Sequence, residues 1–244
     1  MSTRPTIVFV HGAFADSSGW SATLADLVDR GYPVIAVPNQ LRGLQADADQ
    51  VRSVLATIEG LVVLVGHSYG GAVVGEAARG ADNVAALVFV AAYLLDEGES
   101  IATVLDPTEF PGGLLGPETT VVRPFPNPAV PGGQDGDLYI READFAKVFA
   151  ADVAAELSLL MCLEQRPLSL SAFGETAAAN PAWKTLPCWA LVAEDDNAIP
   201  PAGQHWMAPR AEATVRTVAS SHAVMVSHPD AVTAAVLAAA ESFG

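Results

Sequence analysis

Short apolar runs alternate with amphipathic stretches along the first half of the chain. The runs predict strands at Thr6–Val10, Val34–Val37, Leu61–Val65 and Ala86–Ala91. The stretches between them predict helices at Ser21–Arg30, Asp47–Glu59 and Ala72–Arg79. Strands that are apolar on both faces and separated by helices are typical of a parallel sheet covered on both sides. The first half therefore predicts an α/β fold.

The pattern changes near residue 95 and returns near residue 189. Residues 105–136 are rich in Pro and Gly and show little periodicity, and three helical stretches follow, at Glu142–Phe149, Ala151–Gln165 and Leu168–Ala179. The last part of the chain resumes the α/β pattern, with strands at Trp189–Ala193 and Ala213–Val218 and helices at Ala202–Ala208 and Pro229–Glu241.

We therefore expect one α/β core domain with a mostly parallel sheet, formed by residues 1–94 and 182–244. Residues 95–181 are expected to form a mainly helical cap, inserted between late strands and without strands of its own. A separately folding second domain is the alternative.

One predicted strand leads directly into a serine motif. Residues 66–70 read G-H-S-Y-G, immediately after the apolar run Leu61–Val65 and before the helical stretch that starts at Ala72. Between a strand and a helix, G-x-S-x-G is typical of a nucleophile elbow, a sharp turn that holds the serine in a strained conformation. Glycines suit this turn because the strand, the turn and the helix pack closely. The motif predicts Ser68 as a nucleophile.

A serine hydroxyl is a weak nucleophile and needs a base within hydrogen-bond reach, itself oriented by a third group. In this architecture the acid follows a late strand and the histidine comes last in the chain. Asp196 follows the strand Trp189–Ala193, and His222 follows the strand Ala213–Val218. This order predicts a triad of Ser68, His222 and Asp196 at one edge of the sheet.

Four other histidines compete with His222 for the role of base. His11 and His67 lie in glycine motifs, where bracing a turn is the simpler role. His205 falls in a predicted helix, and His228 stands at a helix start. His222 is favoured because it alone combines the expected chain order with a loop after a strand.

Two other aspartates compete with Asp196 for the role of acid. Asp195 is its neighbour, and Asp96 follows an earlier strand, a position to which some folds of this kind move the acid. Both alternatives stay open on the residues alone.

Acyl transfer also needs hydrogen-bond donors aimed at the oxygen that becomes negative. The backbone N–H of Tyr69, at the start of the helix after the serine, is the first expected donor. The loop His11–Phe14 follows the first strand, so the N–H of Ala13 is the second, with Phe14 as the alternative. A simple tight turn is the competing interpretation of this loop.

Together these motifs resemble those of the α/β-hydrolase superfamily over essentially the whole chain. The resemblance rests on the loop His11–Phe14 with Trp20 after it, the motif at 66–70, the loop 196–201 and the pair at 221–222. The chain looks closest to small bacterial esterase-like members, which are similar to the plant methylesterase and hydroxynitrile lyase branch. The spacing from Asp196 to Pro200 agrees with the family pattern and favours Asp196 over Asp195.

Two departures from relatives narrow the chemistry that the resemblance implies. The lyases of that branch carry a threonine after the first-loop histidine and a lysine beside the catalytic one, whereas this chain has Gly12 and Ala223. Haloalkane dehalogenases and epoxide hydrolases have an aspartate where this chain has Ser68. Cyanohydrin cleavage and those two hydrolytic reactions are therefore disfavoured.

The resemblance implies hydrolysis of an ester through an acyl group on the serine, without a metal or an organic cofactor. The insertion would then cap the serine, and most of its apolar side chains would form the interior of the cap. Some must nonetheless line a pocket for a small or medium hydrophobic group. The pocket candidates are Phe14, Phe125 and Met161.

Composition excludes several other classes. The chain has 244 residues and 51% hydrophobic residues, yet no apolar run approaches the roughly 18–20 residues of a membrane span. A formal net charge of −16 argues against nucleic acid or an anionic membrane as a partner.

Cys162 and Cys188 are in no metal-like spacing and are expected to be buried free thiols. No apolar leader precedes the strand at Thr6, so we expect a cytoplasmic location.

Three functions fit this sequence. The favoured one is a carboxylic ester hydrolase acting on a small molecule. The second directs the same triad at a thioester, a lactone, a carbon–carbon bond or a peracid. The third is a ligand receptor or signalling protein that retains the triad. A homodimer stays open as the quaternary state.

Overall fold

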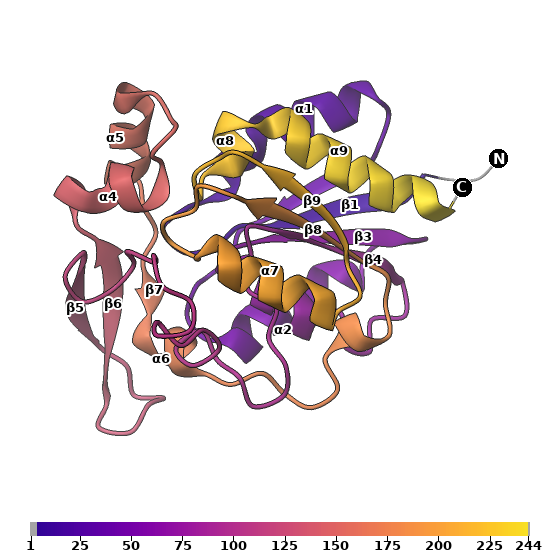
Figure 1. Ribbon diagram of the computed structural model, residues 1–244. Coiled ribbons are helices and arrows are strands. Elements are labelled where there is room, and N and C mark those ends of the chain that lie inside the picture. Colours follow the sequence, from indigo (N-terminus) through magenta and orange to yellow (C-terminus); the bar gives the residue numbers. More distant parts are fainter. Residues whose placement is uncertain (1–3, 244) are drawn as a thin grey trace.

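A six-stranded parallel sheet forms the core of the computed structural model, which describes residues 4–243 (Figure 1). The strand order is β2-β1-β3-β4-β8-β9, and every neighbouring pair is parallel. The strands are β1 Thr6–Val10, β2 Val34–Val37, β3 Val62–His67, β4 Val84–Val90, β8 Cys188–Ala193 and β9 Thr214–Val218. This confirms the predicted α/β fold class. The first three residues and the last one, assigned to the core domain by the sequence, lie outside the described residues.

Helices cover both faces of this sheet because its strands are apolar on both sides. Helices α1 (Ser21–Asp29) and α9 (Pro229–Ala240) pack on one face. Helices α2 (Leu44–Leu55) and α3 (Tyr69–Ala77) cover the other face, and α7 (Pro201–Arg210) follows β8. Alternate side chains of β1 enter different cores: Ile7 and Phe9 pack with Trp20, whereas Val8 and Val10 pack on the side of α3. Because successive side chains of a strand point to opposite faces, β1 contributes to the apolar cores on both sides of the sheet.

Close backbone approach explains the two glycines of the serine motif. A Cβ atom on Gly66 would lie 2.4 Å from the carbonyl oxygen of Gly70. A Cβ atom on Gly70 would lie 2.4 Å from the carbonyl oxygen of Val10 in the neighbouring strand. Both obstacles are backbone atoms, which cannot rotate away. Strand β3 can therefore turn into α3 at this place only because both positions lack a side chain.

The insertion between β4 and β8 contains a second sheet, which corrects the expectation that it has no strands. Its antiparallel order is β5-β6-β7, with β5 at Thr120–Pro126, β6 at Gln134–Ile140 and β7 at Leu168–Ser169. The β-branched run 120–122 pairs with residues 138–140, while the prolines of β5 are tolerated because β5 is an edge strand. Because these prolines interrupt the alternation of apolar and polar residues, the sequence pattern did not predict β5.

Helices accompany the second sheet, as Figure 1 shows on one side of the core. They are α4 (Glu142–Phe149), α5 (Ala155–Leu163) and α6 (Leu170–Gly174). The helix expected at 168–179 shortens to α6, since β7 takes its first residues. The remaining elements are α8 (Val224–Ser227) and three 3-10 turns at Ser17–Trp20, Ala182–Lys184 and Glu241–Phe243. Among the described residues, no helix has the length and apolar character needed to cross a bilayer.

We expect Gly70→Ala to destabilise the fold severely, because the added methyl group meets an immovable carbonyl oxygen. The free energy of unfolding should fall by about 3 kcal/mol or more, measured by urea denaturation. Gly174→Ala is the matched control, because nothing lies within 4 Å of a Cβ atom at that position. Equal stability of the two variants would contradict this account of the turn.

Candidate active site

Ser68 occupies the turn between β3 and α3 in a strained conformation. Its φ is +54° and its ψ is −125°, a region that residues with a side chain rarely adopt. The strain persists because β3 and α3 are both fully buried and fix the turn from either side. Ser68 thus has the backbone geometry of a nucleophile elbow.

His222 and Asp196 form a buried pair at the ends of neighbouring strands. The Nδ1 atom of His222 lies 2.7 Å from Oδ2 of Asp196, and the two residues are 1% and 2% exposed. Asp196 follows β8 and His222 follows β9, so parallel pairing brings their loops to one edge of the sheet. A carboxylate acceptor places the proton on Nδ1, which leaves Nε2 unprotonated and able to act as a base.

The carboxylate of Asp196 is held by three further donors. Its Oδ1 accepts from the N–H groups of Ala198 at 2.7 Å and Ile199 at 2.9 Å. Its Oδ2 accepts from Nε2 of Gln204 at 2.8 Å. Gln204 lies on α7, and no motif in the sequence marked it. These donors fix the direction in which the carboxylate faces His222.

The competing acids lie elsewhere. Asp195 is exposed, and its N–H donates to the carbonyl of Ser220. Asp96 pairs with Nζ of Lys184 at 2.5 Å. Of the three candidate acids, the structure brings Asp196 to His222.

His67 connects the serine turn to the histidine loop. Its Nε2 donates to the backbone oxygen of His222 at 3.0 Å, and the two ring centroids are 4.6 Å apart. The residue before Ser68 therefore contacts the candidate base. Within residues 4–243 no hydrogen bond joins the Ser68 hydroxyl to His222. Without a substrate, such bonds are often long or poorly aligned.

Two buried histidines near the serine are neutral braces. Burial lowers the pKa of His11 to about 4, and its ring bonds the oxygen of Gly12 and the N–H of Asn39, each at 2.9 Å. Burial, and then the charge that His222 can take up, hold the pKa of His67 well below its usual value. Both rings therefore stay uncharged at neutral pH.

The two other histidines lie outside this cluster. Nε2 of His205 lies 3.0 Å from the Glu194 carboxylate. Nδ1 of His228 lies 3.6 Å from Oδ2 of Asp152. Neither is placed beside Asp196.

The loop after β1 packs directly on the serine turn. A Cβ atom on Gly12 would lie 2.6 Å from Cβ of Ser68. The N–H of Phe14 donates to the carbonyl of Arg166 at 2.8 Å, which removes it as an oxyanion donor. By contrast, the N–H groups of Ala13 and Tyr69 have no acceptor among the described residues. These are the two amides that the sequence singled out.

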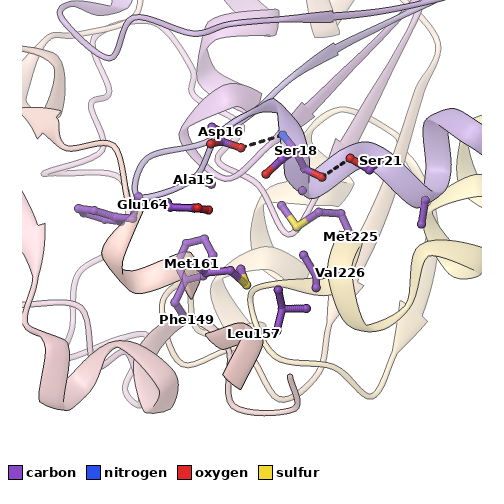
Figure 2. Close-up of a pocket in the computed structure, with 13 residues that line it drawn as sticks. Ala15, Asp16, Ser18, Ser21, Phe149, Leu157, Met161, Glu164, Met225 and Val226 are labelled. Carbon is purple, nitrogen blue, oxygen red and sulfur yellow. Dashed lines mark hydrogen bonds between the residues drawn. The ribbon is translucent and has the colours of Figure 1, made fainter. Parts of the chain in front are cut away.

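A cavity of about 230 Å³ lies beside this cluster, between the loop after β1, helix α5 and helix α8 (Figure 2). Two of the pocket candidates named from the sequence, Phe14 and Met161, line this cavity. Phe149 also lines it, and its ring centroid lies 4.9 Å from that of His222. Ser68 itself is not on this wall, and Phe149 is the lining residue that packs against the candidate base. Phe125 lies elsewhere, with the Arg42 guanidinium 5.2 Å above its ring.

The insertion holds the histidine loop in place. The carboxylate of Asp152 accepts hydrogen bonds from both the N–H and the hydroxyl of Ser221. The N–H of Ala223 donates to the carbonyl of Phe149 at 2.9 Å. Both neighbours of His222 are therefore bonded to the insertion, a role that sequence patterns did not signal for Asp152.

Neither cysteine belongs to the site. Cys162 and Cys188 are buried free thiols, as predicted, and burial raises the pKa of Cys188 to about 12. In the part of the chain that the structure describes, no three His, Cys, Asp or Glu side chains are arranged to hold a metal ion.

Comparisons with known proteins agree with this architecture. The model of the alpha/beta hydrolase family matches residues 7–235. The "Alpha/beta hydrolase nvfD" of Aspergillus novofumigatus is 26% identical over 94% of each chain. A pyrethroid hydrolase from Sphingobium faniae is 24% identical over 98% of each chain, with a TM-score of 0.77. Polyneuridine aldehyde esterase is 21% identical over 96% of this chain and 98% of its own, with a TM-score of 0.79.

The neutral state of His11 predicts a loss of stability in mild acid. The unfolded chain binds a proton at His11 near pH 6.5, whereas the folded protein does so only near pH 4. The contribution of His11 to the free energy of unfolding is therefore fully present above pH 6.5, and it decreases as the pH falls toward 4. We expect His11 to lower the free energy of unfolding by about 2 kcal/mol between pH 7 and 5.

Urea denaturation of the protein and of His11→Gln at both pH values tests this. The glutamine has no proton to gain, so its stability should depend less on pH over that interval. The same pH dependence in both proteins would show that His11 is not held neutral by the fold.

Proposed function

This chain belongs to the alpha/beta hydrolase family, and from that premise we propose that it hydrolyses carboxylic esters through an acyl group on Ser68. The observation that carries the proposal is the buried pair of His222 and Asp196, 2.7 Å apart, whose histidine is braced by the residue next to the strained serine. This arrangement supplies a base of fixed orientation for a serine hydroxyl.

In the proposed first step, Ser68 Oγ bonds to the ester carbonyl carbon while Nε2 of His222 takes the hydroxyl proton. The bond from that carbon to the alcohol oxygen then breaks, and His222 gives the proton to this oxygen, so that the alcohol leaves. Asp196 stabilises the imidazolium that exists between these events.

In the second step, His222 takes a proton from water, and the water oxygen bonds to the acyl carbon. The bond from this carbon to Ser68 breaks, Ser68 regains the proton, and the acid is released. In both steps the protons pass between His222, Ser68, the alcohol and water.

The free amides of Ala13 and Tyr69 support an oxyanion site for both steps. Negative charge develops on the carbonyl oxygen as the carbon becomes tetrahedral, and preorganised N–H donors stabilise it. Each such donor typically changes turnover by about 10²–10³-fold. The buried surroundings strengthen these bonds because little water competes for them.

The apolar cavity beside Phe149 supports an ester with a small or medium hydrophobic group. Two proteins of the same fold are named for hydrolytic activity, one as a pyrethroid hydrolase and one as polyneuridine aldehyde esterase, which is consistent with the proposed reaction. Met161 and Met225 lie on the cavity wall, and their flexible side chains suit groups of varied shape.

We expect the protein to turn over p-nitrophenyl acetate and butyrate, and Ser68→Ala to reduce kcat by about 10⁴-fold or more. Ser53→Ala, at an exposed serine of α2, is the matched control and should keep full activity. Activity that survives Ser68→Ala would overturn the nucleophile assignment. A folded protein without turnover on any ester would favour the receptor hypothesis instead.

Asp196→Asn should reduce kcat by about 10³–10⁴-fold, with the secondary structure retained by circular dichroism. The new amide would present a donor to His222 and Gln204 where the carboxylate accepts from both, so the histidine would carry its proton on the wrong nitrogen. Asp195→Asn removes the same charge one position earlier and should leave kcat within about twofold, as exposed substitutions generally do. A larger loss in Asp195→Asn would assign the acid to that residue.

A further inference from the structure

We propose that the cavity beside Phe149 selects esters whose inserted group carries no negative charge, and that Glu164 sets this selection. The inference rests on the proposed function and names the substrate class of the same site. It concerns whichever part of the ester, acyl or alcohol, enters the cavity.

The charged side chains on the cavity wall have one sign. The wall is mostly apolar, yet it includes the carboxylates of Asp16 and Glu164, and among the described lining residues there is no lysine or arginine. Figure 2 shows both carboxylates toward one edge of the cavity, with Leu157 and Val226 toward the other. A group that enters the cavity therefore meets apolar side chains on one side and negative charge on the other.

The two carboxylates differ in how far their charge is balanced. Asp16 accepts from the N–H of Ser18 at 2.7 Å and begins the 3-10 turn there. Burial raises the pKa of Asp16, but the hydrogen bonds with Ser18 and the nearby positive charge of Arg166 outweigh it, so the net pKa is lowered. Asp16 thus caps the 3-10 turn, and its negative charge is partly balanced by these neighbours.

Glu164 has no such compensation. No hydrogen bond or ion pair of its side chain is present among residues 4–243. The positive charge of Arg166, two residues further along the chain, acts on Asp16 and on His11. Glu164 is also the C-cap of α5, and the helix dipole places partial negative charge at this end. The side chain and the helix end therefore add up to a negative potential at the cavity.

This potential distinguishes substrates by charge. An anionic group would lose its hydration on entering the cavity, where it would contact apolar side chains and lie near the carboxylates of Asp16 and Glu164. Both effects raise the free energy of the bound anion. An uncharged chain has no such penalty, and a cationic end is attracted. The selection should weaken as ionic strength rises, because Glu164 is exposed and its field is screened.

Matched esters test the proposal. One series varies the acyl end: p-nitrophenyl hexanoate, the mono-p-nitrophenyl ester of adipic acid, and the ester of 6-(trimethylammonio)hexanoic acid. A second series places the same three ends on the alcohol of an acetate ester. In at least one series we expect kcat/KM for the anionic ester to be more than about tenfold below the uncharged one at low salt, with the cationic ester not disfavoured.

Glu164→Gln should raise the ratio of anionic to uncharged kcat/KM about three- to fivefold in that series, and added salt should narrow the gap in the original protein. Glu156→Gln is the matched control, because Glu156 lies on the same helix, is exposed and does not line the cavity. It removes the same net charge and should leave the ratio unchanged.

Several results would overturn the proposal. Equal effects of Glu164→Gln and Glu156→Gln would assign the selection to the overall charge of the protein. A preference for the anionic ester would show that Arg166 dominates the cavity. An unchanged ratio in both series would remove Glu164 from the selection.

Failure of the proposed function is distinguished by a binding measurement. Calorimetry on Ser68→Ala with hexanoate, hexanol and hexyltrimethylammonium requires no turnover. If no ester is hydrolysed but hexanoate binds more weakly than the other two, and Glu164→Gln in that background removes the difference, the charge selection stands without ester hydrolysis. Equal binding of all three probes would reject it.

Discussion

The buried hydrogen bond between His222 and Asp196 is the contact on which the rest of the site depends. It forms because β8 and β9 are adjacent and parallel, so that the loops after both strands meet at one edge. Gln204 on α7 holds the acid, while Asp152 and Phe149 of the insertion hold the histidine loop from the other side. Core and insertion thus share one polar centre, and moving either one would misalign the imidazole.

The surroundings of this pair are unusually rich in uncharged imidazole. His67 packs against His222 with the two rings tilted by 46°, and His11 braces the loop that contacts the serine turn. Burial keeps His67 and His11 neutral. Neutral rings supply fixed donors and acceptors without placing a competing positive charge beside the base. The same burial lowers the free energy of unfolding in mild acid. The two histidines bind protons in the unfolded chain at a pH at which they stay neutral in the folded protein. Rigidity of the site and sensitivity to acid therefore have one physical origin.

The insertion combines two tasks. Its helices α4 and α5 contribute Phe149 and Met161 to the cavity wall, while the end of α5 places Glu164 on the same wall. Under the proposed function, the apolar side chains receive the body of the substrate, and the proposed role of the Glu164 carboxylate is to discriminate between charged ends. Since Ser68, Asp196 and His222 all belong to the core, the proposed function implies that substitutions on this wall change which ester fits without moving the serine.

The sequence by itself determined the α/β fold, the strands of the main sheet and the loops that carry Ser68, Asp196 and His222, because these follow from local apolar runs, glycine spacing and chain order. It missed the strands of the insertion, whose prolines mask their alternation, and it gave no signal for Gln204 or Asp152, whose contacts join distant segments. The tertiary structure decided that Asp196 rather than Asp195 contacts His222, and that Met161 rather than Phe125 lies at the cavity. Neighbouring residues in a loop or strand point in different directions, and only packing against other segments determines which side chain reaches the site.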